Sequence, residues 1–341
     1  MKLPAKEKKP AAKTSARKRA SAVATKKVRP EKALRHAVVL GAGRMGADIA
    51  MALAMGGWKC DVIDPGAGVR ERTAPYWKKE LRRLDSTSAS KRMRLHPSPE
   101  NIDWPTVDLV VESVPEDMKL KHAVLKQIEP LVRPQTIIAT NTSSLRISDV
   151  TGVLKHPGRG AGFHLSVPAH IMLAVEITKG EKSAPKTVKK LADWAKALGK
   201  VPIVINRDVP GMLINRLQHA MYREIYHLID TGVATPHDID CAVRFGFGFK
   251  YNIVGPVFSR DIHGIPVHLA TAKQLYPTLY NGRKPSKTLS RLVRQGHHGV
   301  TTGQGFYKWP KATTAKRLEE FASLLNQSLT RIKRVGEPSD F

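Results

Sequence analysis

A glycine-rich turn between an apolar run and an amphipathic segment restricts the possible folds more than any other part of the sequence. Residues 37–40 are apolar, and Gly41, Gly43 and Gly46 follow them with the spacing G-x-G-x-x-G. Apolar side chains then recur at helical spacing, and the next apolar run ends at Asp64. This order predicts a buried strand, a tight turn, a helix and a second strand, as in α/β domains that bind dinucleotides.

Each part of this arrangement has a physical purpose in binding a dinucleotide. The glycines allow a tight turn, a close approach of the backbone to a pyrophosphate, and close packing of the helix on the strand. The phosphates would bind at the helix N-terminus, where unpaired N–H groups and the helix dipole favour negative charge. Asp64 would accept hydrogen bonds from the adenosine ribose and repel a 2′-phosphate, which favours NAD. Arg70 and Arg72 follow closely, so NADP is the alternative.

Further apolar runs alternate with amphipathic segments along the chain. Strand–helix alternation of this kind predicts a mostly parallel sheet with helices on both faces. Ligands of such sheets bind beyond the carboxyl ends of the strands, and the polar stretch TNTSSL directly follows one predicted strand. Its short hydroxyl side chains also suit the start of a helix. The predicted strands are 107–113, 136–140, 160–166, 173–178 and 201–205, with helices between them at 118–129 and 184–198.

The last part of the sequence has the pattern of a helical domain. Apolar residues within 213–229 fall on one broad stripe, and Thr235 followed by Pro236 and Asp238 is typical of a helix start. The predicted fold class is therefore α/β, with an N-terminal Rossmann domain followed by an all-helical C-terminal domain. The expected organisation is a disordered basic tail at 1–34, the dinucleotide-binding domain at 35–208, a helical domain at 209–310 and a C-terminal helix at 311–341.

Positive charge is concentrated at the N-terminus. The formal net charge is +28, and residues 1–35 carry 13 Lys and Arg against Glu7 and Glu31. This segment has almost no large apolar residues, so it cannot bury enough surface to fold. Lys-rich arms bind phosphates without sequence preference, which makes contact with nucleic acid one interpretation. A solvated tail without a specific partner is the favoured one.

The remaining composition excludes several classes of protein. Cys60 and Cys241 are the only cysteines, too few for a disulfide framework or a zinc cluster, and the spacing of His, Cys and acidic residues predicts no metal site. No stretch reaches the roughly 18 unbroken apolar residues of a membrane span. These features favour a protein of the reducing cytoplasm.

Six short motifs occur in the order found in the 3-hydroxyacyl-CoA dehydrogenase family. They are GAGRMGADIA, VVESVPEDMKLK, TNTSSL, GFHLSVPAHIMLAVEI, DVPGMLINRL and TGQGFYKW, and they lie within residues 36–309. The chain therefore resembles this family over most of its length. The resemblance implies a Rossmann domain, a helical domain that forms a homodimer, and oxidation of a secondary hydroxyl β to a carbonyl with NAD as the cofactor.

The resemblance also implies roles for individual residues. The catalytic histidine of the family falls on His164, and the glutamate that orients it falls on Glu176. The serine that polarises the substrate falls on Ser143, and a second polar anchor falls on Asn215. The positions that bind the cofactor are Gly41, Gly43, Arg44, Met45, Gly46, Asp64, Ser113, Glu116, Lys121 and Asn141.

The residue types at these positions suit the implied chemistry. Removing hydride from a carbinol carbon requires that the hydroxyl proton leave as well, and imidazole is suited to accept it because its ordinary pKa is near about 6.5. A carboxylate on the other ring nitrogen fixes the tautomer and stabilises the imidazolium that forms. His164 and Glu176 fall on successive predicted strands, so a pair across neighbouring elements is geometrically reasonable.

Two departures from the CoA-using members bear on the substrate. The segment between Asp64 and Val107 leaves room for one helix, whereas those members have a long helical hairpin that contributes to CoA binding. FGFGFKYNIVGP replaces their compact G-x-G-[YF]-P-M-G-P turn, as in the branch with carnitine dehydrogenase, gulonate 3-dehydrogenase (lambda-crystallin) and a pyridoxine-breakdown dehydrogenase. Val167 also replaces a polar amide of the family, which removes that contact.

These departures slightly favour a small free 3-hydroxy acid over a 3-hydroxyacyl-CoA such as 3-hydroxybutyryl-CoA. The CoA thioester remains the alternative substrate, because four basic side chains of one predicted helix are placed to meet its phosphates. The same side chains are equally explained as the solvated face of that helix. They are Lys78, Lys79, Arg82 and Arg83.

A function of a different class is a non-catalytic structural relative, or a nucleic-acid-binding protein that acts through the basic tail. The chain keeps His164, Glu176, Ser143 and Asn215 together, which argues against loss of catalysis. Binding through the tail is compatible with enzyme activity, and the two can coexist.

Overall fold

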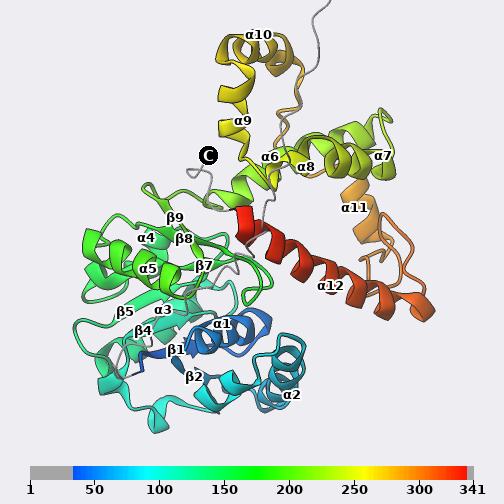
Figure 1. Cartoon of the computed structure of the whole chain (residues 1–341). Helices are drawn as coiled ribbons and strands as arrows, with labels where there is room; N and C mark the ends of the chain where they lie inside the picture. The colour runs from blue at the N-terminus through cyan, green and yellow to red at the C-terminus, as the bar shows by residue number, and fades with distance from the viewer. Residues whose placement is uncertain (1–33, 336–341) are drawn as a thin grey trace, which may run out of the picture. The chain divides into compact units, whose positions relative to one another are not determined.

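The structure, a computed structural model, describes residues 34–335 (Figure 1). The predicted basic tail lies, except for Leu34, outside the described residues, as does the end of the chain at 336–341. Within the described part, no helix combines the length and apolar character that a bilayer span requires.

Residues 36–162 contain a six-stranded parallel sheet in the order β3-β2-β1-β4-β5-β6. In β1 (His36–Leu40), Val38 and Val39 point to opposite faces of the sheet because side chains alternate along a strand. Both are fully buried, one in each of two hydrophobic clusters, so both faces of the sheet are covered. The other strands are β2 (Lys59–Ile63), β3 (Met93–His96), β4 (Leu109–Glu112), β5 (Ile137–Thr140) and β6 (Gly160–Gly162).

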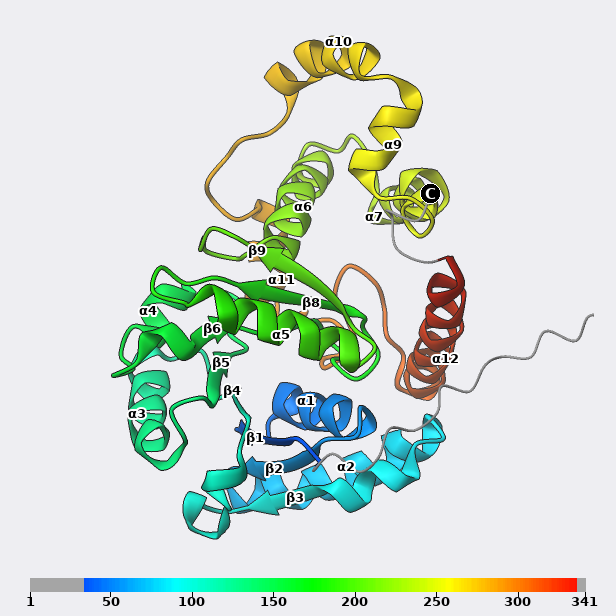
Figure 2. The ribbon, with the colours of Figure 1, turned by 60° about the vertical axis from the view of Figure 1, so that its left-hand side comes forward.

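Helices supply a large part of both clusters. The alanine-rich α1 (Arg44–Met55) lies against β1 and β2 and buries Ile49, Met51 and Leu53 (Figure 2). Small side chains allow this close approach of helix and sheet. Its cluster also contains residues of α2 (Ala67–Arg83) and α5 (Pro185–Ala197), and the opposite cluster contains residues of α3 (Met118–Ile128) and α4 (Ile147–Thr151).

The sheet differs from the prediction in two places. The short strand β3, between Asp64 and Val107, was not predicted. The predicted strand 160–166 is divided at the buried Phe163 into β6 and β7 (His164–Leu165), and β7 belongs to a separate three-stranded sheet. In that sheet β7 pairs antiparallel with β8 (Ala174–Thr178), which pairs parallel with β9 (Val201–Ile205). The register of β7 and β8 places His164 directly opposite Glu176.

Residues 214–335 form helices joined by loops. Thr235 caps α7 (Pro236–Cys241) through the Asp238 amide, as its sequence predicts. The fold class predicted from the sequence, a Rossmann domain followed by a helical C-terminal domain, is confirmed. The other helices are α6 (Ile214–Asp230), a π-helical segment (Ala242–Phe247), α8 (Gly248–Tyr251), α9 (Pro256–His263), α10 (Ile265–Leu275), α11 (Lys287–Arg294) and α12 (Lys311–Val335).

Candidate active site

The glycine-rich turn has the shape that a dinucleotide requires. Gly41 has a φ of +96°, and a Cβ at this position would lie 2.7 Å from the Ser113 carbonyl oxygen. A Cβ on Gly46 would collide with the Gly41 carbonyl oxygen, so helix and strand pack too closely for a side chain there. Gly43, in contrast, faces open space, and it begins α1 without a side-chain cap. The turn therefore leaves room for a pyrophosphate at an uncapped helix N-terminus.

Asp64 is fixed beside this turn by two backbone amides. Its Oδ2 accepts a hydrogen bond from Ala42 N at 2.8 Å, and its Oδ1 accepts one from Gly66 N at 2.8 Å. Each carboxylate oxygen keeps a second lone pair for a ligand. Arg70 donates to the Asp64 carbonyl oxygen at 2.6 Å, which ties this arginine to the same corner. Asp64 lines the adjacent cleft.

A cleft of about 990 Å³ joins the turn to the predicted catalytic residues. Gly46 and Glu176 do not line it: Gly46 packs under the turn, and Glu176 lies behind His164. Gln218 and His219 of α6 also line the cleft, although the sequence did not single them out. The predicted residues that line it are Gly41, Gly43, Arg44, Met45, Asp64, Ser113, Glu116, Lys121, Asn141, Ser143, His164 and Asn215.

His164 and Glu176 form a buried pair across β7 and β8. The Nδ1 atom of His164 lies 2.7 Å from Oε2 of Glu176, and Glu176 is fully buried. The other carboxylate oxygen accepts the Leu213 and Ile214 amides at 2.8 Å each, at the start of α6. Burial by itself raises the pKa of Glu176, but these hydrogen bonds outweigh it and lower the pKa below its usual value.

An ionised Glu176 fixes the tautomer of the His164 ring. A carboxylate only accepts hydrogen bonds, so the Nδ1 atom of His164 carries the hydrogen and donates it. The Nε2 atom of the neutral ring then has a free lone pair, on a residue that lines the cleft. This is the arrangement of a general base.

Ser143 and Asn215 lie together at the same cleft. The Asn215 side-chain amide donates to the Ser143 carbonyl oxygen at 3.2 Å, so α6 contacts the polar loop directly. In the same loop Asn141 accepts a hydrogen bond from Leu165 N at 2.9 Å, which fixes the loop beside β7. The structure thus brings together His164, Ser143 and Asn215, which are far apart in the sequence.

Glu116 has contacts that the sequence did not predict. Its Oε1 atom accepts the Thr142 hydroxyl at 2.6 Å and the Ser143 amide at 2.8 Å, and it also accepts the amide and the hydroxyl of Ser144 at 3.2 and 3.1 Å. Burial by itself raises the pKa of Glu116, but these hydrogen bonds and the charge of Lys121 lower it to about 2. Glu116 is therefore an ionised clamp on the loop that carries Ser143.

Lys121 is buried and uses its hydrogens within the protein. Its Nζ atom donates to Glu112 Oε1 at 2.8 Å and to the Val114 carbonyl oxygen at 3.1 Å, and it lies 3.1 Å from Glu116 Oε2. The side chain is 1% exposed. Glu112 was not singled out from the sequence, where the only signal is an acidic residue at the end of a buried strand.

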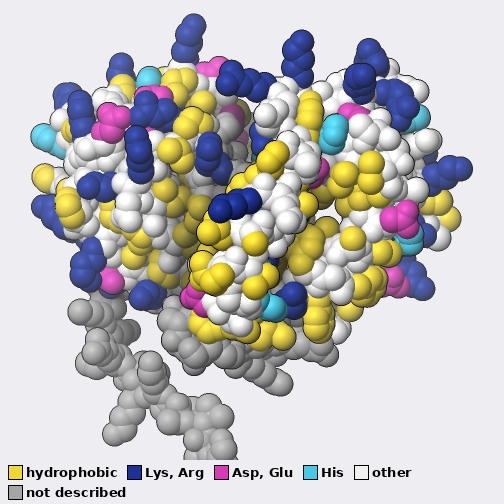
Figure 3. Space-filling view, turned by 90° about the horizontal axis from the view of Figure 1, so that it is seen from above, with side chains coloured by type: hydrophobic (Ala, Val, Ile, Leu, Met, Phe, Trp, Pro, Cys, Tyr) yellow, Lys and Arg dark blue, Asp and Glu magenta, His cyan; other side chains and the backbone are white. Residues whose placement is uncertain are grey.

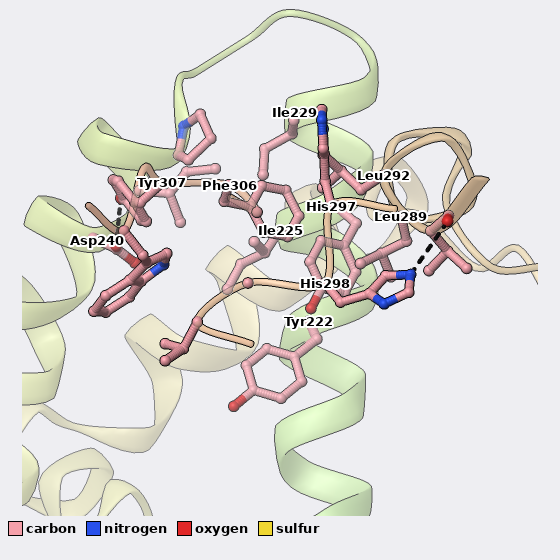
Figure 4. A pocket seen from close by; sticks show the side chains of 18 of the residues that line it. Tyr222, Ile225, Ile229, Asp240, Leu289, Leu292, His297, His298, Phe306 and Tyr307 are labelled. Atoms are coloured by element: carbon pink, nitrogen blue, oxygen red, sulfur yellow. Dashed lines mark hydrogen bonds between the residues drawn. The ribbon is translucent and has the colours of Figure 1, made fainter. Parts of the chain in front are cut away.

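A second cavity, of about 620 Å³, lies in the helical part between α6, α7, α11 and residues 297–309 (Figure 4). Ile225, Leu289 and Phe306 line it, and Tyr307 donates to Asp240 at 2.6 Å. This hydrogen bond and burial raise the pKa of Tyr307 to about 12. None of the predicted site residues lines this cavity. Across the described residues no cluster of three His, Cys or acidic side chains is placed to hold a metal ion.

Both parts of the chain match known families. Residues 36–209 match "3-hydroxyacyl-CoA dehydrogenase, NAD binding domain", and residues 211–309 match "3-hydroxyacyl-CoA dehydrogenase, C-terminal domain". The sequence is similar to 5-formyl-3-hydroxy-2-methylpyridine 4-carboxylate 5-dehydrogenase of Mesorhizobium japonicum, with 30% identity over 298 residues, which are 86% of this chain and 96% of that protein.

Two solved structures are similar to most of this chain. A crystal structure of 5-formyl-3-hydroxy-2-methylpyridine 4-carboxylic acid 5-dehydrogenase, described as an NAD⁺-dependent dismutase, has a TM-score of 0.82 at 28% identity and covers 88% of this chain and 99% of its own. The crystal structure of (S)-3-hydroxybutyryl-CoA dehydrogenase from Ralstonia eutropha has a TM-score of 0.66 at 30% identity and covers 82% of this chain and 100% of its own.

Proposed function

This chain belongs to the 3-hydroxyacyl-CoA dehydrogenase family, and from that premise we propose that it oxidises the β-hydroxyl of a small free 3-hydroxy acid to a ketone. The family is one of NAD-dependent oxidoreductases, and NAD supplies the acceptor for the hydride. The observation that carries the proposal is the pair of His164 and Glu176, 2.7 Å apart, in the cleft that begins at the glycine-rich turn.

Different residues of the chain have different roles in the proposed reaction. His164 would accept the hydroxyl proton at Nε2 while the carbinol carbon loses its hydride, and Glu176 would stabilise the imidazolium that forms. Ser143 and Asn215 would hydrogen-bond the oxygen as the carbonyl develops. The residues proposed to hold the cofactor are Gly41, Gly43, Gly46, Asp64, Ser113 and Asn141, together with Arg44 and Met45 at the start of α1.

A free acid is favoured over a CoA thioester by the fold around α2. Only this helix and one six-residue 3-10 helix (Thr87–Arg92) lie between β2 and β3. Trp77 and Leu81 of α2 face inward, whereas the basic residues Lys78, Lys79, Arg82 and Arg83 are exposed, so they are explained as the solvated face of an amphipathic helix. The similar solved structure with the higher TM-score is named for a free carboxylic acid, which supports the same choice. A 3-hydroxyacyl-CoA such as 3-hydroxybutyryl-CoA is the alternative.

Replacing the proposed base tests this function. His164→Ala should lower kcat for NAD reduction by about 10²- to 10⁴-fold, since it removes the general base. Ser143→Ala should lower it by about 10²-fold. Because both groups act on one oxygen, the double variant should lose less than the product of the two losses. His156→Ala is the matched control, since this exposed histidine lies outside the cleft. A Ser143→Ala enzyme with only a lower melting temperature would show that this hydroxyl is structural.

We further propose that a second copy of the chain covers the apolar faces of the helical part. α6 buries none of its residues within this chain, and Phe245, Val257 and Ile262 are 74%, 79% and 63% exposed. Figure 3, which looks onto α10 from above, shows hydrophobic side chains gathered on this surface. Monomeric proteins rarely leave so much contiguous apolar surface in water. Light scattering should therefore give the mass of a homodimer, and a wild-type monomer at micromolar concentration would contradict the proposal.

A cytoplasmic location is proposed as well. Both cysteines are free thiols, and Cys60 is buried where burial raises its pKa, so neither depends on an oxidising compartment. Cells that express the chain with a fluorescent tag can be fractionated, and the fluorescence of each fraction measured. The fluorescence should be in the cytoplasmic fraction, and its recovery in an organelle fraction would contradict the proposal.

A further inference from the structure

We propose that Glu112, Lys121 and Glu116 form a buried chain of charges that holds the loop of Ser143 in its reactive position. Glu112 is then a positioning residue for the reaction, although it does not line the cleft. The inference rests on the proposed function in one respect, namely that the Ser143 hydroxyl contacts the reacting oxygen.

The first link is Glu112, at the end of β4. Its side chain is fully buried and all its polar contacts lie within the protein. One oxygen accepts Lys121 Nζ and the Val114 amide, both at 2.8 Å, and the other accepts the Thr140 hydroxyl at 2.6 Å. Because Thr140 ends β5, Glu112 joins the carboxyl ends of two neighbouring strands to Lys121.

The second link is the Lys121 ammonium group. An unpaired buried charge is costly, and here two carboxylates, Glu112 and Glu116, compensate it. An ammonium group has three hydrogens, and the Val114 carbonyl oxygen is the acceptor for the third. With all three engaged, Lys121 has no hydrogen left for a ligand. Its geometry is that of a group that positions Glu116, which is a different role from the direct cofactor contact that the family resemblance implies.

The third link is Glu116, which connects Lys121 to the loop that carries Ser143. Its Oε2 atom faces Lys121 at 3.1 Å, so the Oε1 atom is free to accept the loop's amides and hydroxyls. The Ser143 hydroxyl itself lies 3.4 Å from Oε1, which is long for a hydrogen bond between a hydroxyl and a carboxylate. The clamp therefore holds the Ser143 backbone and leaves its hydroxyl available to the cleft.

The test is Glu112→Gln, which keeps the shape of the side chain but removes one of the two negative charges that balance Lys121. A displaced Lys121 would release Glu116 and shift the loop, and misplacement by about 1 Å costs about 10²-fold in rate. We expect kcat to fall about 10- to 100-fold, while the dissociation constant of NAD, measured by fluorescence, stays within about threefold of the wild type. An unchanged kcat would overturn the inference.

Glu129→Gln is the matched control. Glu129 is also a buried glutamate, paired with Arg159 at 2.9 Å, and it accepts the amides of Lys155 and His156. It does not line the cleft. This variant should lose stability without losing kcat. Equal losses of kcat in both glutamine variants, once folding is matched by circular dichroism, would show a general effect of buried charge and would overturn the inference.

A double-mutant cycle identifies the group through which Glu112 acts. In the Ser143→Ala background, Glu112→Gln should cost less in kcat than in the wild type, because the hydroxyl it positions is gone. Equal costs in both backgrounds would overturn the inference. If Ser143→Ala loses activity while Glu112→Gln does not, only this inference fails. If His164→Ala and Ser143→Ala both keep activity, the proposed function fails with it.

A second variant covers the case in which Glu112→Gln does not fold. Thr142→Val removes the hydroxyl that donates to Glu116 at 2.6 Å and accepts the Leu145 amide at 3.2 Å, and it leaves the pair of Glu112 and Lys121 intact. It should lower kcat about tenfold with little change in the dissociation constant of NAD. A Thr142→Val enzyme with wild-type kcat would overturn the clamp.

Discussion

Glu176→Gln should abolish the basicity of His164 while leaving the fold nearly intact. The Gln oxygen can still accept the Leu213 and Ile214 amides at the start of α6, which now bond to Glu176 at 2.8 Å each. Its NH₂ group then faces Nδ1 of His164, which must become a hydrogen-bond acceptor. The ring hydrogen consequently moves to Nε2, the atom that has to receive the substrate proton.

The magnitude follows from the tautomer. A wrong tautomer in a histidine–carboxylate pair costs about 10⁴-fold in kcat in serine proteases, or about 5.5 kcal/mol of activation free energy. The free energy of unfolding should change by only about 1–2 kcal/mol, because most hydrogen bonds of Glu176 survive. Stopped-flow measurement of NADH formation at saturating substrate gives the first quantity, and denaturant titration gives the second.

Asp230→Asn provides the control for the helix cap. Asp230 accepts the amides of Lys287 and Thr288 at 2.9 Å each at the start of α11, as Glu176 does at α6, but it has no histidine partner. This variant should lose about 1 kcal/mol of stability and no kcat. If Glu176→Gln kept kcat within about threefold of the wild type, the carboxylate would not set the tautomer and the assignment of His164 as the base would be refuted.

Three further outcomes are expected. Asp64→Ala should reduce the preference for NAD over NADP in fluorescence titration, and tighter NADP binding by the wild type would instead assign the ribose pocket to Arg70. Deletion of residues 1–33 should leave kcat unchanged, and a gel shift that needs the deleted residues would assign the tail to nucleic acid. Asp61→Asn should lower the free energy of unfolding by about 3 kcal/mol at pH 7, because the buried Asp61 carboxylate accepts hydrogen bonds from His36 at 2.7 Å and from His96 at 2.9 Å. Burial raises the pKa of Asp61, but these bonds lower it overall, so its stabilisation is present above the unfolded pKa of about 3.9 and is lost as pH falls toward the folded pKa. Denaturant titration should show that the difference in unfolding free energy between the wild type and Asp61→Asn is smaller at pH 3.5 than at pH 7. An equal difference at both pH values would contradict this.

The sequence was sufficient to predict the Rossmann sheet but not the strands at its two edges, β3 and β6. Runs rich in Val and Leu, such as 107–113, predict buried strands because both faces of a parallel sheet are covered. β3 (MRLH) carries no such signal, and Met93 is its only buried residue. The change of sheet at Phe163 was not predictable either, because only tertiary packing divides the run 160–166 at this residue.

The site was predictable to the extent that it rests on local motifs. The glycine-rich turn with Asp64 follows from its motif and its order along the chain, and the pair of His164 and Glu176 follows from the resemblance to the family. The clamp of Glu116 on the loop was not predictable, because it joins residues 26 positions apart. It depends on β4 lying beside β5, and strand order is a property of the whole sheet.

The most direct test of the proposed function is NADH formation by the full chain with a panel of 3-hydroxy acids, each supplied free and as its CoA thioester. The proposal predicts reduction of NAD with at least one free 3-hydroxy acid and a higher kcat/KM for that acid than for its thioester. A higher kcat/KM for the thioesters would make 3-hydroxyacyl-CoA the substrate. No NADH from any member of the panel, with NAD bound and the protein folded, would contradict the proposed oxidation itself.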